Sequence, residues 1–159
     1  MMKYIYYYDT VLGKIGIAEE NGQITNLIFE SEKINANIIL QETKILKIAF
    51  RQLEEYLQGS REVFELQLNP SGTEFQKKDW LALQQIPYGK TVSYGDIAKQ
   101  IGCPKGARAV GLANNKNPIP IFIPCHRVIG ASGNLVGYGG GIDKKIKLLE
   151  IEGIKINRR

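Results

Sequence analysis

The stretch Asn117-Pro118-Ile119-Pro120-Ile121-Phe122-Ile123-Pro124-Cys125-His126-Arg127-Val128 organises the C-terminal half of this chain around one cysteine. Its prolines predict a rigid extended segment rather than a sheet strand, because proline cannot donate to a central ladder. Cys125 is followed directly by His126, the only histidine in 159 residues. An imidazole beside a thiol lowers the thiol pKa and favours the reactive thiolate, so the pair predicts a nucleophile. The alternative is a buried, inert cysteine beside a surface histidine.

Two short helices are predicted upstream of this stretch. Ser93, with Asp96 three residues later, is a variant of the capping box and predicts a helix that runs to Ile101. Gly102-Cys103-Pro104 breaks that helix, and a second one is predicted from about Lys105 to Asn114. Two short helices across a tight turn are typical of a helix-turn-helix, although an ordinary αα-corner has the same spacing.

Two further helices and a glycine-rich loop complete the C-terminal half. One helix, ended by Pro87-Tyr88-Gly89, is predicted to turn Phe75, Trp80, Leu81 and Leu83 toward the core. The last helix is predicted to end at Gly153 and to bury Ile142, Ile146, Leu149 and Ile151. Between them, residues 137–141 form a loop with almost no side chains.

The first third predicts a small α/β unit. Strands are expected at Lys3–Asp9, Lys14–Glu19 and Gln23–Phe29, with an Asn21-Gly22 hairpin turn between the last two. A helix with apolar positions from Ile45 to Leu57 follows, and Arg61–Leu68 suits either an edge strand or an extended linker.

Asn69-Pro70-Ser71-Gly72 then predicts a domain boundary. The fold class is therefore α+β: a small N-terminal α/β domain with a short antiparallel sheet over residues 1–70, and a mostly helical domain over residues 71–159. The second domain contains the helix-turn-helix and the candidate active-site cysteine.

Composition excludes several classes of protein. Hydrophobic residues make up 43% and charged residues 23% of the chain, as in globular domains. We expect no membrane association and a cytoplasmic location, because there is no signal-like segment at the start and no apolar run of about 18 residues. Cys103 and Cys125 do not form a disulfide framework, and two cysteines with one histidine lack the spacing of a metal site.

The positive charge is concentrated in the half that holds Cys125. Residues 1–70 carry 7 Lys and Arg against 10 Asp and Glu, whereas residues 71–159 carry 14 against 6. The net charges are thus −3 and +8. Such an asymmetry predicts that the second half meets a polyanion, most simply nucleic acid. A solvated basic face is the alternative.

Five motifs, in order along the chain, resemble the active-site region of the O6-alkylguanine-DNA alkyltransferases. They are Val92-Ser93-Tyr94, Ala107-Arg108-Ala109-Val110-Gly111, Pro124-Cys125-His126-Arg127-Val128, Tyr138-Gly139-Gly140-Gly141 and Leu148-Leu149-Glu150-Ile151-Glu152-Gly153. The resemblance spans roughly Phe75 to Gly153, and the first 70 residues match only in outline, as the ribonuclease H-like domain of that family.

The resemblance implies DNA repair by direct alkyl transfer. Cys125 would take a methyl or larger alkyl group from O6-alkylguanine, with O4-alkylthymine as a further candidate substrate. The product is a thioether that water cannot cleave, so each molecule would act once. His126 would be the base, and Glu152 would orient it. A carboxylate at the end of a helix is unfavourable by itself, which suggests a specific role for Glu152; a solvated surface carboxylate is the alternative.

The same resemblance implies roles for further residues. Asn117 would be the hinge between the recognition helix and the cysteine; the alternative is an ordinary turn asparagine. Tyr94 would be the acid that donates to the guanine; the alternative is an aromatic residue that only packs in the core. Arg108 would replace the flipped base or bind a phosphate. The remaining residues expected at DNA or at the flipped base are Ala107, Pro120, Val128, Tyr138, Gly139 and Gly140.

The implied partner is double-stranded DNA containing alkylated guanine, bound by a monomer. No cofactor and no metal are expected, because family members with a zinc site use N-terminal Cys and His residues that this chain lacks. Two features depart from the pattern of other members: Gly139 stands where they often have serine, and Asn114-Asn115-Lys116 is more polar. Two other classes remain open, a lesion sensor without a nucleophilic cysteine and a thiol hydrolase with multiple turnovers.

Overall fold

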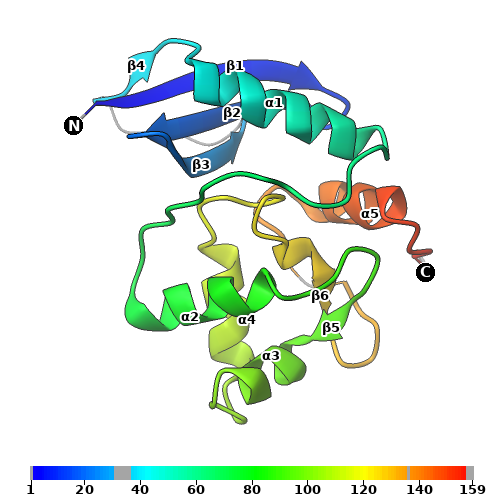
Figure 1. Ribbon diagram of the computed structural model, residues 1–159. Coiled ribbons are helices and arrows are strands. Elements are labelled where there is room, and N and C mark those ends of the chain that lie inside the picture. The colour runs from blue at the N-terminus through cyan, green and yellow to red at the C-terminus, as the bar shows by residue number, and fades with distance from the viewer. Residues whose placement is uncertain (1, 31–36, 136, 157–159) are drawn as a thin grey trace. The chain divides into compact units, whose positions relative to one another are not determined.

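The computed structural model describes residues 2–30, 37–135 and 137–156, and the chain divides into two compact units, residues 1–71 and 72–159 (Figure 1). In the residues so described, the first unit combines a small sheet with one helix, and the second is mostly helical. The predicted α+β fold class is therefore confirmed. None of the helices in the described ranges has the length and apolar character that a membrane crossing requires.

The first unit is built on a four-stranded sheet. Its strands are β1 (Lys3–Thr10), β2 (Gly13–Glu20), β3 (Gln23–Phe29) and β4 (Ile39–Leu40), in the order β3-β2-β1-β4. The first three strands form the predicted antiparallel meander, and Asn21 and Gly22 both have positive φ, as a tight hairpin turn requires. β4 was not expected, and it pairs parallel to β1.

One helix, α1 (Lys44–Leu57), packs against β1 and β2 of this sheet (Figure 1). Thr43 caps its N-terminus and also donates a hydrogen bond to Glu19 of β2, at 2.9 Å. The buried side of the helix carries Leu46, Ala49, Leu53 and Tyr56. Residues 61–68 form a linker rather than a strand, with one isolated bridge from Leu68 to Ile24.

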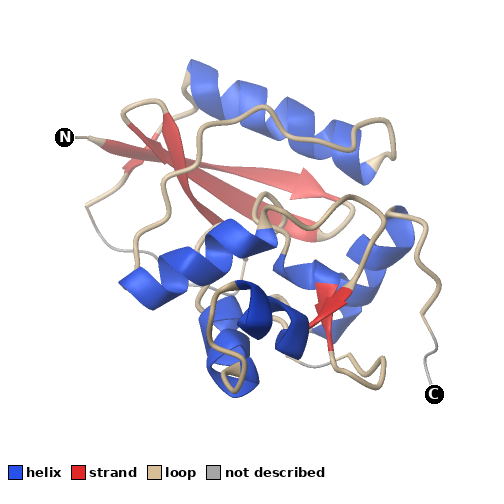
Figure 2. Cartoon of the chain, turned by 60° about the horizontal axis from the view of Figure 1, so that its bottom comes forward, coloured by secondary structure: helices blue, strands red, loops and turns tan. Residues whose placement is uncertain are grey.

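Over residues 72–135 and 137–156, the second unit holds five helical segments and two short strands. They are α2 (Glu74–Leu83), β5 (Val92–Ser93), α3 (Tyr94–Gln100), α4 (Ala107–Asn115), the 3-10 turn η1 (Cys125–Arg127), β6 (Val128–Ile129) and α5 (Ile142–Ile151). The helices α2, α3 and α4 pack on one another. β5 and β6 pair in parallel, as the two short arrows side by side in Figure 2 show. This pairing brings the segment after Cys125 beside the start of α3.

Two side chains that were predicted to lie in the core, those of Leu81 and Ile142, are exposed instead. Leu81 is 62% exposed and Ile142 is 37% exposed, whereas Asp79 and Lys145 are buried on the same helices. Charge made Asp79 and Lys145 look like surface residues in the sequence. Helical geometry nevertheless places Asp79 beside Trp80 and Leu83, and Lys145 beside Ile146 and Leu149, on the faces that turn inward.

The predicted extended segment before Cys125 is in fact a tight turn. The Ile123 N–H donates to the carbonyl of Ile119 at 2.9 Å, and Ile121 has a φ of 74°. Positive φ is unfavourable for a β-branched residue, so the surrounding contacts must hold this turn in place. Asn117 supplies two of them: its amide nitrogen donates to Ile123 O and its oxygen accepts from Ile119 N, both at 2.9 Å. The prolines correctly predicted that this segment is not a sheet strand. Its turn conformation is set by the two hydrogen bonds of the Asn117 side chain.

Candidate active site around Cys125

The two predicted short helices, α3 and α4, form on either side of a tight turn. The capping box of Ser93 and Asp96 starts α3, and Ile101 ends it. In the turn, the Gly106 N–H donates to Cys103 O at 2.7 Å, and a Cβ on Gly106 would lie 2.7 Å from the Cys103 sulfur. A side chain at position 106 would therefore push the turn apart. Arg108 then lies exposed on α4, with Leu112 and Asn115 on the same helical face.

Cys125 begins the η1 turn and is only 7% exposed. The clamped turn of residues 119–123 precedes it, and β6 follows it. Three segments therefore hold the thiol: the Asn117 clamp, the η1 turn and the β5–β6 pair. A group that must meet a substrate carbon in line benefits from such a fixed position.

The buried surroundings of Cys125 disfavour its thiolate form. Burial raises the pKa of Cys125 to about 11, and the charge of Asp79 raises it too, whereas a hydrogen bond from Asn117 and the charge of Lys145 lower it. The sequence prediction of a thiol acidified by its histidine neighbour is thus wrong for this state. Desolvation outweighs the favourable contacts, because a buried thiolate has lost its hydration.

His126 is fully buried and pairs with Glu152, which caps the C-terminus of α5. The two side chains meet at 2.7 Å, between His126 Nε2 and Glu152 Oε2. Since a carboxylate only accepts, Nε2 carries the proton, and in the neutral ring Nδ1 carries the lone pair. Burial lowers the pKa of His126 more than Glu152 raises it, so the ring is a neutral base at pH 7.

Glu152 is also bound by Arg127, for which the sequence analysis proposed no role. The Arg127 guanidinium donates to both carboxylate oxygens and, through Nη1, to Ile86 O at 2.7 Å. The Gly89 N–H donates to Glu152 Oε1 at 2.9 Å. These donors compensate for the unfavourable helix-end position of the carboxylate. The surface alternative for Glu152 is therefore wrong, since the residue is 6% exposed.

Tyr94 and Lys145 complete the surroundings of the thiol. The Lys145 ammonium lies 5.9 Å from the centre of the Tyr94 ring, and both residues interact electrostatically with Cys125. Burial raises the pKa of Tyr94 and lowers that of Lys145 to about 8. Lys145 was missed in the sequence. Its one signal is its position, three residues after Ile142 and four before Leu149, on the inward stripe of the last helix.

Replacing Lys145 by methionine is expected to make the protein more stable but less reactive. The folded-state pKa is about 8 against an ordinary 10.5, so the buried ammonium costs stability below pH 8, and this cost fades as the pH rises to 10.5. At pH 7 the Lys145→Met protein should gain up to about 3 kcal/mol. Its alkyl-transfer rate should fall roughly tenfold, because the thiol loses a nearby cation.

Urea unfolding between pH 7 and 10.5 and single-turnover transfer kinetics would check both effects. Lys147→Met is the matched control, since Lys147 is exposed on the same helix. Equal behaviour of the two variants would contradict the role of Lys145.

The remaining predicted residues lie in three places. Arg108 is exposed and Ala107 half-buried at the start of α4. Pro120 belongs to the clamped turn, and the side chain of Val128 is fully buried in β6, so that position can meet a base only through its backbone. Tyr138, Gly139 and Gly140 lie in a turn closed by a hydrogen bond from Gly141 N to Tyr138 O, and a Cβ on Gly137 would lie 3.5 Å from the side-chain amide of Asn115.

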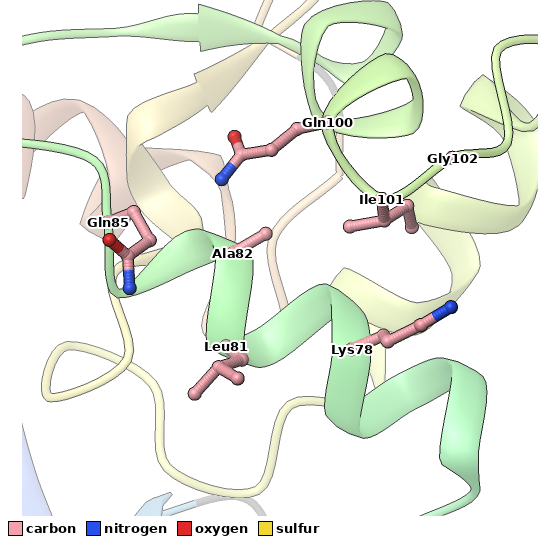
Figure 3. A pocket seen from close by; sticks show the side chains of 7 residues that line it. All are labelled: Lys78, Leu81, Ala82, Gln85, Gln100, Ile101 and Gly102. Atoms are coloured by element: carbon pink, nitrogen blue, oxygen red, sulfur yellow. The ribbon is translucent and has the colours of Figure 1, made fainter.

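A hollow of about 540 Å³ lies between α2 and the end of α3, away from these residues (Figure 3). Its lining is Lys78, Leu81, Ala82, Gln85, Gln100, Ile101 and Gly102, and none of these is a candidate site residue. Within the described parts of the chain, no three His, Cys, Asp or Glu side chains gather as metal ligands would.

Known proteins of one family match nearly the whole chain. Residues 2–70 match the ribonuclease-like domain, and residues 74–154 the DNA binding domain, of 6-O-methylguanine DNA methyltransferase. The chain is 48% identical over 154 residues to the methylated-DNA–protein-cysteine methyltransferase of Methanosarcina acetivorans, covering 94% of this chain and 99% of that protein.

Solved structures give the same result. Mycobacterium tuberculosis OGT in complex with DNA superposes with a TM-score of 0.89 at 46% identity, covering 94% of this chain and 92% of that one. S. pombe Atl1, in complex with damaged DNA containing O6-carboxymethylguanine, matches only 56% of this chain and 84% of its own, at 35% identity and a TM-score of 0.51. The chain therefore belongs to the 6-O-methylguanine DNA methyltransferase family.

Proposed function

We propose that Cys125 is the residue that accepts the alkyl group. As a member of its family, the protein is a methylated-DNA–protein-cysteine methyltransferase, which repairs DNA by alkyl transfer to one of its own cysteines. The assignment is carried by the surroundings of the thiol. Cys125 is buried and interacts with the Asn117 side chain, and the next residue is a neutral histidine whose Nε2 donates a hydrogen bond to Glu152. This is the nucleophile, base and orienter arrangement of thiol catalysis, applied to a saturated carbon.

The transfer is an in-line displacement at the alkyl carbon. The Cys125 sulfur–carbon bond forms while the bond from that carbon to guanine O6 breaks, and the thiol proton passes to His126, directly or through a water. Guanine leaves as an anion unless a donor neutralises it, and Tyr94 supplies that hydrogen bond. Because burial raises the pKa of Tyr94, its hydroxyl stays protonated and serves as a donor rather than losing its proton outright. After the displacement the thiol proton is on His126 and guanine is an anion that accepts a hydrogen bond from Tyr94. His126 then releases its proton to solvent and guanine takes one up, so the net proton movement is from sulfur to guanine.

The product is a thioether, which has no carbonyl for water to attack. A thiol hydrolase is regenerated by hydrolysis of its acyl-enzyme, whereas here the alkyl group stays on Cys125. The protein therefore acts once per molecule, and the amount of repair equals the amount of active protein.

Access to the target carbon requires that the guanine leave the helical stack. We assign this step to α4: Arg108 enters the space that the base vacates, and the small Ala107 lets the helix approach the groove closely. The flipped guanine then lies between Pro120 and Tyr138, with Val128, Gly139 and Gly140 offering backbone groups to its edge. The basic character of residues 71–159 supports this contact with DNA.

The same proposal extends to domains, partners and location. Residues 1–70 form the ribonuclease H-like domain, and residues 71–159 form the helix-turn-helix and alkyl-acceptor domain. The partner is double-stranded DNA with O6-alkylated guanine, bound by a monomer. A reducing compartment such as the cytoplasm suits a protein whose function needs a free thiol at Cys125.

Mass spectrometry after incubation with a duplex containing one O6-methylguanine tests the function. We expect one methyl group per protein molecule, located on Cys125, and none on the Cys125→Ala variant. Methylation elsewhere, or an equal gain in that variant, would contradict the assignment of Cys125. Tight binding of the lesion without mass gain would indicate a sensor, and repeated turnover of an ester or amide would indicate a hydrolase.

A further inference from the structure

The turn after α2 lies against the buried ion pair at the end of α5 and has no part in the displacement described above. The Lys90 N–H donates to Pro87 O at 3.2 Å, and Gly89 has a φ of 77°. Such a hydrogen bond, with a positive φ at the third residue, is typical of a type II turn, and that position favours glycine. The Pro87-Tyr88-Gly89 motif, which the sequence indicated only as the end of a helix, therefore forms a turn of defined geometry.

The backbone of this segment binds both members of the ion pair. The Gly89 N–H donates to Glu152 Oε1 at 2.9 Å, and the carbonyl of Ile86 accepts from Arg127 Nη1 at 2.7 Å. A buried ion pair is favourable only when further hydrogen bonds satisfy its remaining donors and acceptors, and this segment supplies two of them.

Tyr88 is the side chain of the turn that contacts both sides of the pair. The central carbon of the Arg127 guanidinium lies 5.7 Å from the centre of the Tyr88 ring, within the range of a cation–π interaction. The Tyr88 hydroxyl donates to Ile151 O, the carbonyl directly before Glu152, at 3.2 Å. This carbonyl belongs to the last turn of α5, where the helix itself provides no partner. Tyr88 therefore restrains the guanidinium with its ring and the end of the helix with its hydroxyl.

The position of Glu152 decides which nitrogen of His126 carries the proton. Glu152 Oε2 accepts from His126 Nε2 at 2.7 Å, so the lone pair of the neutral ring is on Nδ1. A carboxylate that moves away loses this selection, and a misplacement of about 1 Å at a reacting group can cost about 10²-fold in rate. Contacts that restrain Glu152 therefore act on the base that takes the thiol proton.

We propose that Tyr88 is a positioning residue that holds the ion pair at the end of α5, so that the proton of His126 stays on Nε2. This inference rests on the proposed function, in which His126 takes the thiol proton. Tyr88 acts through Arg127 and Glu152: its ring restrains the first, and its hydroxyl restrains the backbone that carries the second.

The nitrogen-15 spectrum of the imidazole tests this role directly, since His126 is the only histidine. At pH 7.5 the parent should show the proton on Nε2. Tyr88→Leu removes both the ring and the hydroxyl, and its signals should shift toward the form with the proton on Nδ1. Lys90→Leu is the matched control, because Lys90 is the exposed last residue of the same turn, and its spectrum should match that of the parent. A parent proton on Nδ1, or the same spectrum in the two variants, would overturn the proposal.

Tyr88→Phe separates the two contacts and serves if Tyr88→Leu does not fold. It keeps the ring beside the guanidinium and removes only the donor to Ile151 O. The N–H of Glu152, which donates to Leu148 O at 3.2 Å, should then exchange with deuterium about fivefold faster than in the parent, as loss of one hydrogen bond at a helix end predicts. Equal exchange in Tyr88→Phe and Lys90→Leu would overturn the proposal.

Single-turnover methyl transfer at saturating O6-methylguanine duplex measures the consequence for the reaction. The Tyr88→Leu rate should fall roughly tenfold, because the base spends part of its time in the wrong tautomer or orientation. Tyr88→Phe should recover most of that loss, since it keeps the ring. A Tyr88→Leu rate equal to that of the parent would overturn the proposal.

The spectra and the exchange measurements need no DNA. Absence of methyl transfer by the parent would therefore reject the proposed function, while identical spectra of Tyr88→Leu and Lys90→Leu would reject the role of Tyr88, and the two failures can be distinguished.

Discussion

Glu152→Ala is expected to lower the free energy of unfolding of the unit formed by residues 72–159 by about 3–5 kcal/mol. The carboxylate is buried and accepts hydrogen bonds from His126, Arg127 and Gly89. Its removal leaves the guanidinium of Arg127, 7% exposed, without its counter-charge in a dry environment. That penalty, more than the lost contacts themselves, makes the expected effect large.

Urea unfolding followed by fluorescence would measure this loss, since Trp80 is the only tryptophan and lies buried in the same unit. Glu150→Ala is the matched control, because Glu150 is exposed two residues earlier on α5, and its variant should unfold within about 0.5 kcal/mol of the parent. Glu152→Gln, which retains an acceptor for Gly89 but not the charge, should fall between the two. A Glu152→Ala protein as stable as the Glu150→Ala protein would contradict the buried ion pair.

His126→Gln is expected to slow alkyl transfer by about 10²–10⁴-fold at pH 7.5, the range for loss of a general base. The glutamine amide retains a donor for Glu152 but cannot take a proton from the thiol. Because the pKa of Cys125 is about 11, very little thiolate is present at neutral pH without a base. The variant's rate should therefore rise up to tenfold per pH unit toward pH 9.5, while the parent rate changes little above pH 7.5.

Single-turnover methyl transfer from an O6-methylguanine duplex, measured across this pH range, would show the difference in slope. Affinity for an unmodified duplex serves as the control and should not change, since His126 is 0% exposed. Parallel pH profiles for parent and variant would mean that another group removes the thiol proton.

Features set by a few neighbouring residues were predicted correctly. The Asn21-Gly22 hairpin and the Ser93–Asp96 capping box follow from local backbone geometry, and both form. Glu152 was singled out because its place at a helix end is unfavourable, and its partner His126 accounts for that place. Such signals lie within one turn or one motif, so no knowledge of the rest of the fold is needed to see them.

The missed features depend on segments far apart in the chain. Lys145 and Asp79 look like surface residues in the sequence, and their burial beside Cys125 is visible only when α2, α5 and η1 come together. Ile121 was expected in an extended wall, and the Asn117 clamp folds its segment into a turn. The sign of the pKa change at Cys125 was wrong for the same reason, because burial, the largest cause, cannot be read from a neighbouring residue.

The amino-acid sequence by itself determined the kind of chemistry: a thiol and the only imidazole side by side, a basic half suited to nucleic acid, and an ordered set of motifs. Only the tertiary structure decided how readily the Cys125 thiol loses its proton. Desolvation, aided by the charge of Asp79 and opposed by that of Lys145, raises its pKa, and the two charges are brought to Cys125 by two different helices. The reason is physical: residue types set which reactions are available, whereas the energy of a buried charge depends on everything packed around it.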